Sequence, residues 1–258
     1  MNGAFYIGAT GLDAQQRALD VLAHDIANIN TVGYKRTALR FSELAGTASV
    51  EDASRTAVDS VDTNAGVSLS ATSRVWTPGE IRQTGSATDL AIDGPGYIET
   101  LGPGGDVLLW RGGALKVDGD GFLATAGGTR LRAMIAVPEE ATGFSIARDG
   151  SVVAQLPGDT GTETIGRIDL VTVKDTDSLI DTGAGFYAMS DPSGVVGADA
   201  GAQGAGAFVQ GALEQANVQL SEEMVTLMLL QRTYAANAQL VQAGDQLMSI
   251  ANNLRRNS

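Results

Sequence analysis

The side chains that could do chemistry in this sequence are mainly carboxylates. Among 258 residues there are 30 acidic residues, one histidine (His24) and no cysteine. The lack of cysteine excludes thiol catalysis, disulfides and iron–sulfur ligation, and one histidine removes most zinc sites and histidine-based catalysis. The functions that remain possible on residue types alone are calcium binding, phosphate binding and catalysis by paired carboxylates.

These remaining sites are each better explained by turns or by chance. The sequence DGDG at 118–121 resembles the start of a calcium loop, but the twelfth position, which needs an acid, is Thr129. The sequence GPGG at 102–105 lacks the Lys-Ser/Thr and the helical pattern that follow a phosphate-binding loop. Adjacent acids such as Glu139 and Glu140 arise by chance among 30. We therefore predict two turns, no catalytic, cofactor or metal residues, and no enzymatic activity.

The stretch HDIANINTVGYKRT, residues 24–37, marks the point where an N-terminal helical pattern stops. Asn30, Gly33, Lys35 and Arg36 are the residue types found at a helix C-terminus, where Gly or Asn ends the helix and cations meet its negative end. One such residue is enough for a cap. The surplus indicates a second role for this segment.

Both ends of the chain carry helical heptad patterns. Near the N-terminus, Phe5, Leu12, Leu19 and Ile26 recur at seven-residue intervals, with gaps in the pattern at Gly8 and Gln15. At the C-terminus the heptad residues are Leu213, Leu220, Leu227, Tyr234, Val241 and Met248, flanked by Leu230, Leu240, Leu247 and Leu254.

The C-terminal pattern predicts a helix from about 213 to 255, with Ser221, Glu222 and Glu223 as an N-terminal signal. Such a helix would run roughly 60 Å at 1.5 Å per residue and needs partner helices to cover its apolar stripe. A helical bundle within the monomer is one solution. Pairing of the two terminal helices, outside the middle of the chain, is the other.

The middle of the chain reads as β-structure. Short runs rich in β-branched and aromatic residues are separated by Gly and Asp-Gly turns. The runs are DLAIDG, GYIETL, VLLWRG, ALKVDGDGFLAT, RLRAMIAV, GFSIARDGSVVAQL and IGRIDLVTV. Their spacing predicts an antiparallel sandwich or barrel, and the whole chain is predicted to be α+β. Residues 45–73 are interpreted as an extended connector, and 194–208 as a Gly/Ala tract that leads to the C-terminal helix.

The net charge of −13 belongs to the middle of the chain. Residues 41–210 contain 10 basic and 23 acidic residues, whereas the two ends together sum to zero. An acidic middle with no basic cluster argues against nucleic acid and anionic lipid as partners. There is no run of about 18 apolar residues, so we predict no membrane insertion, and the N-terminus lacks the pattern of a secretory signal.

The N-terminal segment TGLDAQQRALDVLAHDIANINTVGYKR resembles the signature of the bacterial flagellar rod and hook proteins. In that family the helix ends in Ala-Asn, then Thr, then Gly-aromatic-Lys/Arg. The matching positions are Ala27, Asn28, Thr31, Gly33, Tyr34, Lys35 and Arg36. His24 and Asp25 depart from the family, which tends to have polar amides there. Asn2 and Gly3 also depart from it, because a basic or larger residue is common at those positions.

The C-terminal segment is independently similar to the closing helix of the same family. The Gly-x-Leu-Glu-x-x-Asn-Val entry is matched by Gly211, Leu213, Glu214, Asn217 and Val218. GEIRQTGSATDLAIDGPGYIE is also similar to the family's entry into its β domain. Total length and the long connector resemble distal rod subunits most. The shorter proximal rod subunits, of similar design, are the alternative. Hook proteins resemble this chain less, because they normally carry a larger middle.

The resemblance implies an axial core formed by 1–40 and 211–258, with the two terminal helices paired as a coiled coil. Residues 41–80 would be the extended connector and 81–210 the β-rich outer domain. The implied function is a structural subunit of a hollow helical drive shaft that transmits torque and encloses an export channel. No cofactor is implied. The location is the periplasm-spanning rod of the basal body, reached without a cleavable signal peptide.

The implied partners are the chain itself, proximal rod proteins, hook protein, the surrounding P and L ring proteins and the flagellar export apparatus. The expected assembly interface consists of Leu12, Leu19, Leu22, Ile26, Asn28, Thr31, Gly33, Tyr34, Lys35, Leu213, Asn217, Leu220, Leu227, Leu230, Tyr234, Val241 and Met248. A secreted β-rich enzyme with a helical dimerisation module and a coiled-coil adhesin or stalk are the alternatives from other classes.

Overall fold

The structure is a computed structural model that describes residues 2–44, 66–157, 162–189, 194–202 and 204–256. The chain forms two compact units. The first, which we call the helical unit, comprises Met1–Ala27, Thr37–Arg74 and Gln219–Ser258. The second, the β unit, comprises Asn28–Arg36 and Val75–Val218. The chain therefore crosses between the units four times.

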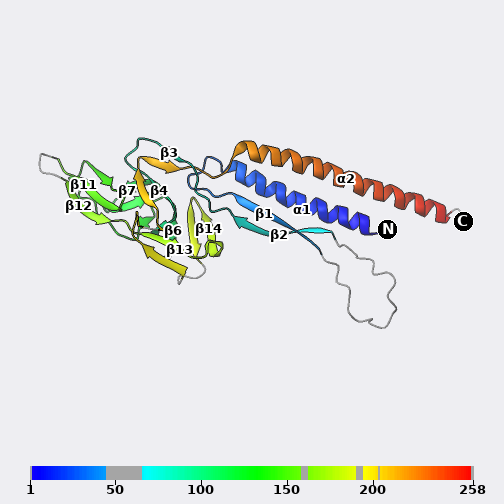
Figure 1. Cartoon of the computed structure of the whole chain (residues 1–258), viewed down its shortest axis with the longest axis horizontal. Helices are drawn as coiled ribbons and strands as arrows, with labels where there is room; N and C mark the ends of the chain where they lie inside the picture. The colour runs from blue at the N-terminus through cyan, green and yellow to red at the C-terminus, as the bar shows by residue number, and fades with distance from the viewer. Residues whose placement is uncertain (1, 45–65, 158–161, 190–193, 203, 257–258) are drawn as a thin grey trace, which may run out of the picture. The chain divides into compact units, whose positions relative to one another are not determined.

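The helical unit contains two helices and one hairpin (Figure 1). Helix α1 spans Asn2–Ala27 and helix α2 spans Leu220–Arg256. Strands β1, Thr37–Glu43, and β2, Val67–Arg74, pair antiparallel. Neither helix has a stretch long and apolar enough to cross a membrane, as judged over the described residues.

The two helices lie side by side and run antiparallel (Figure 1). A Cβ atom added to Gly8 would lie 2.7 Å from Val241 Cγ2, and one added to Gly11 would lie 2.8 Å from Asn237 Nδ2. The contact at Gly8 is with a branched side chain packed against it, so a larger residue there would force the helices to shift, whereas at Gly11 the terminal amide of Asn237 could rotate away.

The buried stripe of α1 differs from the one that the heptad pattern predicts. It consists of Gly8, Gly11, Ala14, Gln15, Ala18, Leu22 and Asp25. Leu12 and Leu19 flank this stripe and are half-buried, while Phe5 is 43% exposed. The pattern treats Gly8 and Gln15 as gaps because it weighs side-chain hydrophobicity, whereas close helix packing selects small residues.

Part of the expected connector is a β-strand. Residues 67–74, interpreted from the sequence as the end of an extended connector, form β2 and pair with β1. The Asp25 carboxylate near the end of α1 accepts a hydrogen bond from the backbone N of Thr37 at 3.0 Å, which ties the helix to the first strand. The expected connector residues 45–65 lie outside the described residues.

The β unit contains the remaining strands, and all of its pairings are antiparallel. The strands are β3 Ile81–Gln83, β4 Asp89–Asp93, β5 Tyr97–Leu101, β6 Val107–Trp110, β7 Gly113–Val117, β8 Leu123–Thr125, β9 Arg130–Leu131, β10 Gly143–Ile146, β11 Ser151–Gln155, β12 Thr162–Arg167, β13 Leu170–Val173, β14 Leu179–Gly183, β15 Phe186–Met189, β16 Val195–Ala198, β17 Ala207–Gln210 and β18 Ala212–Glu214. A 3₁₀ turn, η1, covers Thr176–Ser178.

Eleven of these strands form one curled sheet in the order β14-β15-β6-β5-β9-β8-β7-β4-β17, with β13 paired to both β5 and β16 (Figure 1). Strands β10-β11-β12 form a second sheet, and β18 pairs with β3. The larger core packs around Leu90, Trp110 and Phe208, and the smaller one around Tyr97 and Tyr187. The α+β composition and the curled β-rich middle agree with the fold class predicted from the sequence.

Each of the seven predicted apolar runs contains at least one strand. The turns predicted at 102–105 and 118–121 are also confirmed, with Gly105 N bonded to Gly102 O and Gly121 N bonded to Asp118 O. The predicted helix start at 213 is wrong, because Leu213 lies in β18 and α2 begins at Leu220. The heptad run continues into a strand there because strand alternation and helix periodicity coincide over so short a segment.

Candidate assembly interface

The carboxylate of Glu214 is the centre of a buried polar junction in the β unit. Glu214 is only 2% exposed. Its Oε1 accepts hydrogen bonds from Lys35 Nζ at 2.6 Å and from Gly79 N at 2.9 Å, and its Oε2 accepts one from Arg111 Nε at 2.8 Å. One anion is therefore shared by two cations.

The two cations have further partners that hold them in place. Lys35 Nζ also donates to Thr77 O at 3.0 Å, and the Arg111 guanidinium donates to Gly96 O and Gly94 O, each at 2.5 Å. Burial lowers the pKa of Lys35, although the charge and hydrogen bond of Glu214 act to raise it. Such a cluster is tolerated in a protein interior only because its charged groups have hydrogen-bond partners.

Backbone bonds extend this junction on both sides. Gly33 N donates to Glu214 O at 2.9 Å, and Asn217 N donates to Tyr34 O at 3.2 Å. The Asn217 side chain accepts from Arg36 N at 2.7 Å and donates to Val75 O at 2.7 Å. The two sequence motifs that carry the family resemblance, one from each end of the chain, thus bind each other.

Glycine is required at one point of the junction. Gly33 has a φ of +70°, a conformation that L side chains rarely adopt. This geometry lets the chain turn between helix α1 and the segment that reaches Glu214.

Seven of the expected interface residues lie at this junction or next to it. Gly33, Tyr34 and Lys35 are buried, whereas Asn28, Thr31, Leu213 and Asn217 are half-buried. Thr31 Oγ1 donates to Asn28 Oδ1 at 3.1 Å. Lys35 and Asn217 both contribute side-chain hydrogen bonds to this junction.

The other expected residues lie on the helices. Leu22 is buried, and Leu12, Leu19, Ile26, Leu227, Leu230, Val241 and Met248 are half-buried. Leu220 is 43% exposed and Tyr234 is 38% exposed. The heptad residues of α2 are therefore mostly on the side that faces α1.

A second apolar face of α2 stays open, and we call it the open stripe. Its large side chains are between 50% and 64% exposed. They are Met224, Val225, Met228, Leu229, Leu240, Leu247 and Ile250. At 3.6 residues per turn, Val225 and Ile250 lie about half a turn of the helix away from Val241, which contacts α1.

The sequence contained a signal for the open stripe that heptad reading missed. Leu240 and Leu247 were identified only as flanks of the heptad residues, yet they repeat seven apart on a separate face. Helix α1 adds a smaller exposed apolar group at its N-terminus. Phe5, Tyr6 and Ile7 are 43%, 55% and 43% exposed.

The titratable groups elsewhere form turns and ion pairs. Asp118 Oδ1 accepts a hydrogen bond from Phe122 N, which lowers the pKa of this carboxyl, and Arg130 Nε lies 2.5 Å from Asp118 Oδ2. These contacts fix the Asp-Gly turn. No group of three or more His, Cys, Asp or Glu side chains suited to a metal ion is found within the described part of the chain.

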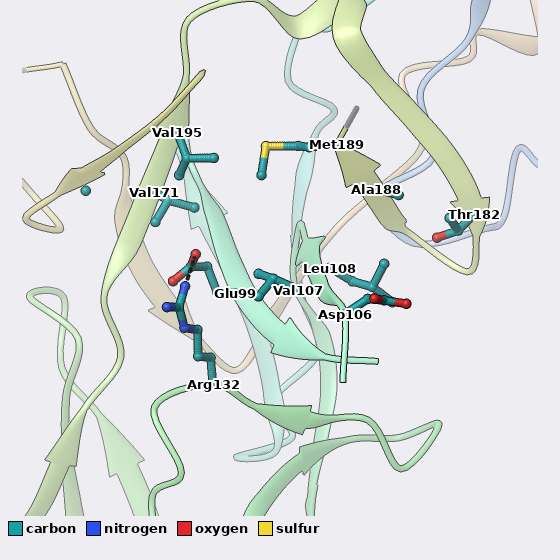
Figure 2. Close-up of a pocket in the computed structure, with 11 residues that line it drawn as sticks. Glu99, Asp106, Val107, Leu108, Arg132, Val171, Thr182, Ala188, Met189 and Val195 are labelled. Atoms are coloured by element: carbon teal, nitrogen blue, oxygen red, sulfur yellow. Dashed lines mark hydrogen bonds and ion pairs between the residues drawn. The ribbon is translucent and has the colours of Figure 1, made fainter. Parts of the chain in front are cut away.

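A cavity of about 740 Å³ opens on the curled sheet (Figure 2). Its lining is largely apolar and includes Val107, Val171 and Met189. Glu99 and Arg132 lie together at one side of it and form an ion pair of 2.7 Å. The carboxylate of Glu99 is thus engaged by a cation, and Asp106 supplies the second carboxylate of the lining.

Comparison with known proteins gives matches along the whole chain. Three family models match: flagella basal body rod protein over residues 5–35, flagellar hook protein FlgE/F/G D1 domain over 91–154, and flagellar basal body rod FlgEFG protein C-terminal over 209–254.

Individual relatives match over nearly their full length. The flagellar basal-body rod protein FlgG of Borreliella burgdorferi is 32% identical, with 99% of this chain and 100% of that protein covered. The protein of the same name from Bacillus subtilis is 30% identical over 98% of this chain and 99% of its own length. The flagellar hook protein FlgE of Brucella abortus is 37% identical over 56% of this chain and 34% of its own.

Proposed function

The chain belongs to the flagellar basal-body rod protein family, and on that premise we propose that it is a structural subunit of the distal rod. Copies of it assemble into a hollow helical drive shaft, which transmits torque and encloses the export channel. The observation that carries this proposal is the open stripe of α2. A proximal rod subunit of the same family is the alternative.

The open stripe supports assembly because several large apolar side chains left exposed on one helix face are typical of a protein–protein interface. Seven side chains contribute, each at least half exposed. Covering them would contribute about 5–10 kcal/mol before the entropy of association is subtracted. Neighbouring copies supply matching apolar surface, both from their own stripes and from the exposed side chains at the start of α1.

The two helices are proposed to act as a coiled coil at the axis of the polymer. Residues 1–40 and 211–258 form this axial core, 41–80 the connector and 81–210 the outer domain. The neutral ends suit a packed tube, while the 23 acidic residues of 41–210 suit an outer surface that resists unwanted association. Stiffness follows from the close helix approach that Gly8 and Gly11 permit.

The proposed interface between subunits combines the expected helix residues with the open stripe. Leu220 and Tyr234 are its most exposed expected members. Leu12, Leu19, Leu227, Val241 and Met248 are proposed to support it from within the helix pair. The further partners proposed are proximal rod proteins, hook protein, the P and L ring proteins and the flagellar export apparatus. The subunit is placed by this proposal in the periplasm-spanning rod.

The test compares two double variants that add the same charge to the same turns of α2. Leu240→Glu with Leu247→Glu places two carboxylates on the open stripe, and Gln242→Glu with Gln246→Glu places them on exposed polar positions. We expect the parent chain and the glutamine variant to form polymers in sedimentation and electron microscopy. The stripe variant should stay monomeric, with an unchanged circular dichroism spectrum and melting temperature.

Polymer formation by the stripe variant at the parent's concentration would refute the assembly role of this face. Deletion of residues 1–35 or 213–258 gives a coarser check of the same proposal. Assembly or incorporation into basal bodies that survives either deletion would rule out a rod built on the terminal helices.

A further inference from the structure

All the sulfur atoms of this chain belong to methionine side chains. The sequence contains six methionines and no cysteine. A peroxide that reaches the chain therefore finds no thiol, and the thioether of methionine is the side-chain sulfur left to react with it. Which methionines react depends on which of them are exposed to solvent.

Exposure separates the described methionines into two groups. Met134, Met224 and Met228 are 52%, 50% and 53% exposed, whereas Met189 and Met248 are half-buried. Met134 belongs to the β unit, and Met224 and Met228 belong to the open stripe of α2. The chain thus has two exposed methionines on the stripe and, elsewhere, a third of nearly equal exposure that serves as an internal control.

The two methionines of the stripe form one patch. Met224 and Met228 are four residues apart in α2, so their side chains lie on the same face of the helix, one turn apart. Val225 and Leu229, 64% and 63% exposed, follow each of them in the sequence. Both sulfur atoms are therefore within an apolar surface that solvent reaches in a free subunit. A second copy that packs on the stripe would cover them.

Oxidation would reverse the polarity of this patch. A lone pair of the thioether sulfur attacks one oxygen of hydrogen peroxide, so that an S–O bond forms and the O–O bond breaks. The sulfur loses two electrons, and the departing oxygen keeps two hydrogens and leaves as water. The product, a sulfoxide, carries a strong hydrogen-bond acceptor. Burial of that acceptor against an apolar partner surface is costly, because it loses its bonds to water.

We propose that Met224 and Met228 are an oxidation-sensitive modification site that controls assembly. Hydrogen peroxide converts the pair to sulfoxides in a free subunit, and the oxidised stripe no longer packs against another copy. Reduction of the sulfoxides restores the apolar surface, and assembly in turn shields the pair from peroxide. The inference rests on the proposed function, since it requires the open stripe to be an interface between copies.

The first arm of the test locates the oxidised residues. The parent chain is treated with hydrogen peroxide below the concentration at which it polymerises, the assembled polymer is treated in parallel, and peptide mass spectrometry follows each methionine. In the free chain we expect Met134, Met224 and Met228 to be oxidised at similar rates. In the polymer, Met224 and Met228 should react at least about tenfold more slowly, because oxidation follows exposure.

The second arm measures assembly. Peroxide should raise the concentration that the parent chain needs for polymer formation about tenfold, as one unpaired buried polar group predicts. Met224→Leu with Met228→Leu keeps the stripe apolar without oxidisable sulfur, so this double variant should assemble equally well before and after treatment. The matched control, Met134→Leu, should remain sensitive to peroxide. Treatment of the oxidised parent with a methionine sulfoxide reductase should restore assembly, a result that needs no substitution.

Several results would overturn the proposal. They are normal assembly of a parent chain oxidised at both stripe methionines, and continued peroxide sensitivity of the double leucine variant. A lowered melting temperature of the oxidised monomer would place the effect in folding instead of at the interface. Should the double variant not assemble even untreated, reductase treatment decides, and no recovery of the parent counts against the proposal. If the untreated parent forms no polymer although Met224 and Met228 still oxidise, the rod function itself fails, and control of assembly fails with it.

Discussion

The buried junction around Glu214 and the open stripe of α2 differ in whether their side chains find partners within the chain. At the junction, the Glu214 carboxylate accepts hydrogen bonds from Lys35, Gly79 and Arg111 of its own chain. On the stripe, seven large apolar side chains are each at least 50% exposed. The difference teaches which interactions a subunit must complete alone and which it can leave for its neighbours.

The physical reason is that an unpaired buried charge costs far more free energy than an apolar side chain that stays exposed to water. An unpaired charge buried in a protein interior costs several kcal/mol, so Lys35, Arg111 and Glu214 must find one another as the chain folds. An apolar side chain on an exposed helix loses only the stabilisation that burial would have added. The open stripe can therefore remain uncovered until another surface reaches it.

The largest expected effect comes from removing the shared anion. Glu214→Ala leaves Lys35 and Arg111 buried without their carboxylate, and we expect unfolding to become easier by about 3–5 kcal/mol. Denaturant unfolding of the full chain measures this. The matched control, Glu163→Ala on an exposed strand position, should change stability by less than about 0.5 kcal/mol. Equal stability of the two variants would mean that the junction does not depend on its charge cluster.

A pH effect beside the junction should be the next largest. Burial raises the pKa of Tyr97 from its ordinary value of 10.0 to about 12. The folded state thus favours the neutral phenol, so its contribution is intact below pH 10 and is lost as the pH rises through 12. We expect a loss of about 2–3 kcal/mol across that window, by proton linkage.

The pH effect is isolated by comparing variants. Tyr97→Phe should lack the part of the alkaline destabilisation that belongs to this phenol, whereas Tyr6→Phe, at a residue 55% exposed, should keep it. Stability is measured by denaturant unfolding at pH 9, 10, 11 and 12. Identical curves for both variants would show that the phenol is not shielded from water.

A matched pair of glycines tests how the helical unit differs from the junction. A methyl group at Gly8 would lie 2.7 Å from Val241 Cγ2, whereas at Gly244 it would meet nothing within 4 Å. We expect Gly8→Ala to destabilise the helix pair by about 1–3 kcal/mol. Gly244→Ala should stabilise it by up to about 1 kcal/mol, because alanine is the better helix former. Thermal melting followed at 222 nm measures both, and the same sign for both would contradict the close approach at Gly8.

The smallest effect is expected on the open stripe of an isolated subunit. Leu247→Ser replaces a side chain that is 63% exposed, so the stability of the monomer should change by less than about 0.5 kcal/mol. Melting at a concentration where the chain is monomeric measures it. A loss as large as that of Glu214→Ala would mean that this face is already packed within the chain, and would end the contrast between the two regions.

Local pattern was enough to predict most of the β unit. The apolar run that holds Leu90 and Ile92 and the Asp-Gly turn at 118–121 depend on nearest neighbours, and both were predicted in place. Strand β16 was missed because Val195–Ala198 lies in a tract of small residues that reads as a linker. Its pairing with β13 supplies the order that the tract lacks by itself.

The candidate site was harder to predict for a related reason. The motif residues of 28–36 and 211–218 were found from the sequence, but nothing local tells that Lys35 bonds Glu214, 179 positions later in the chain. Burial also changes the meaning of Lys35, which reads as a surface cation in the sequence and is 1% exposed in the structure.

The sequence by itself determined the class of the chain, its two terminal helices, its acidic β-rich middle and its lack of cysteine, because these follow from composition and short-range periodicity. Only the tertiary structure decided which face of each helix is covered. Gly8 and Gly11 attract no attention in a hydrophobic pattern, yet they set the contact with Val241 and Asn237. That choice fixes which side of α2 is left open, since a helix can turn only one face toward a single partner.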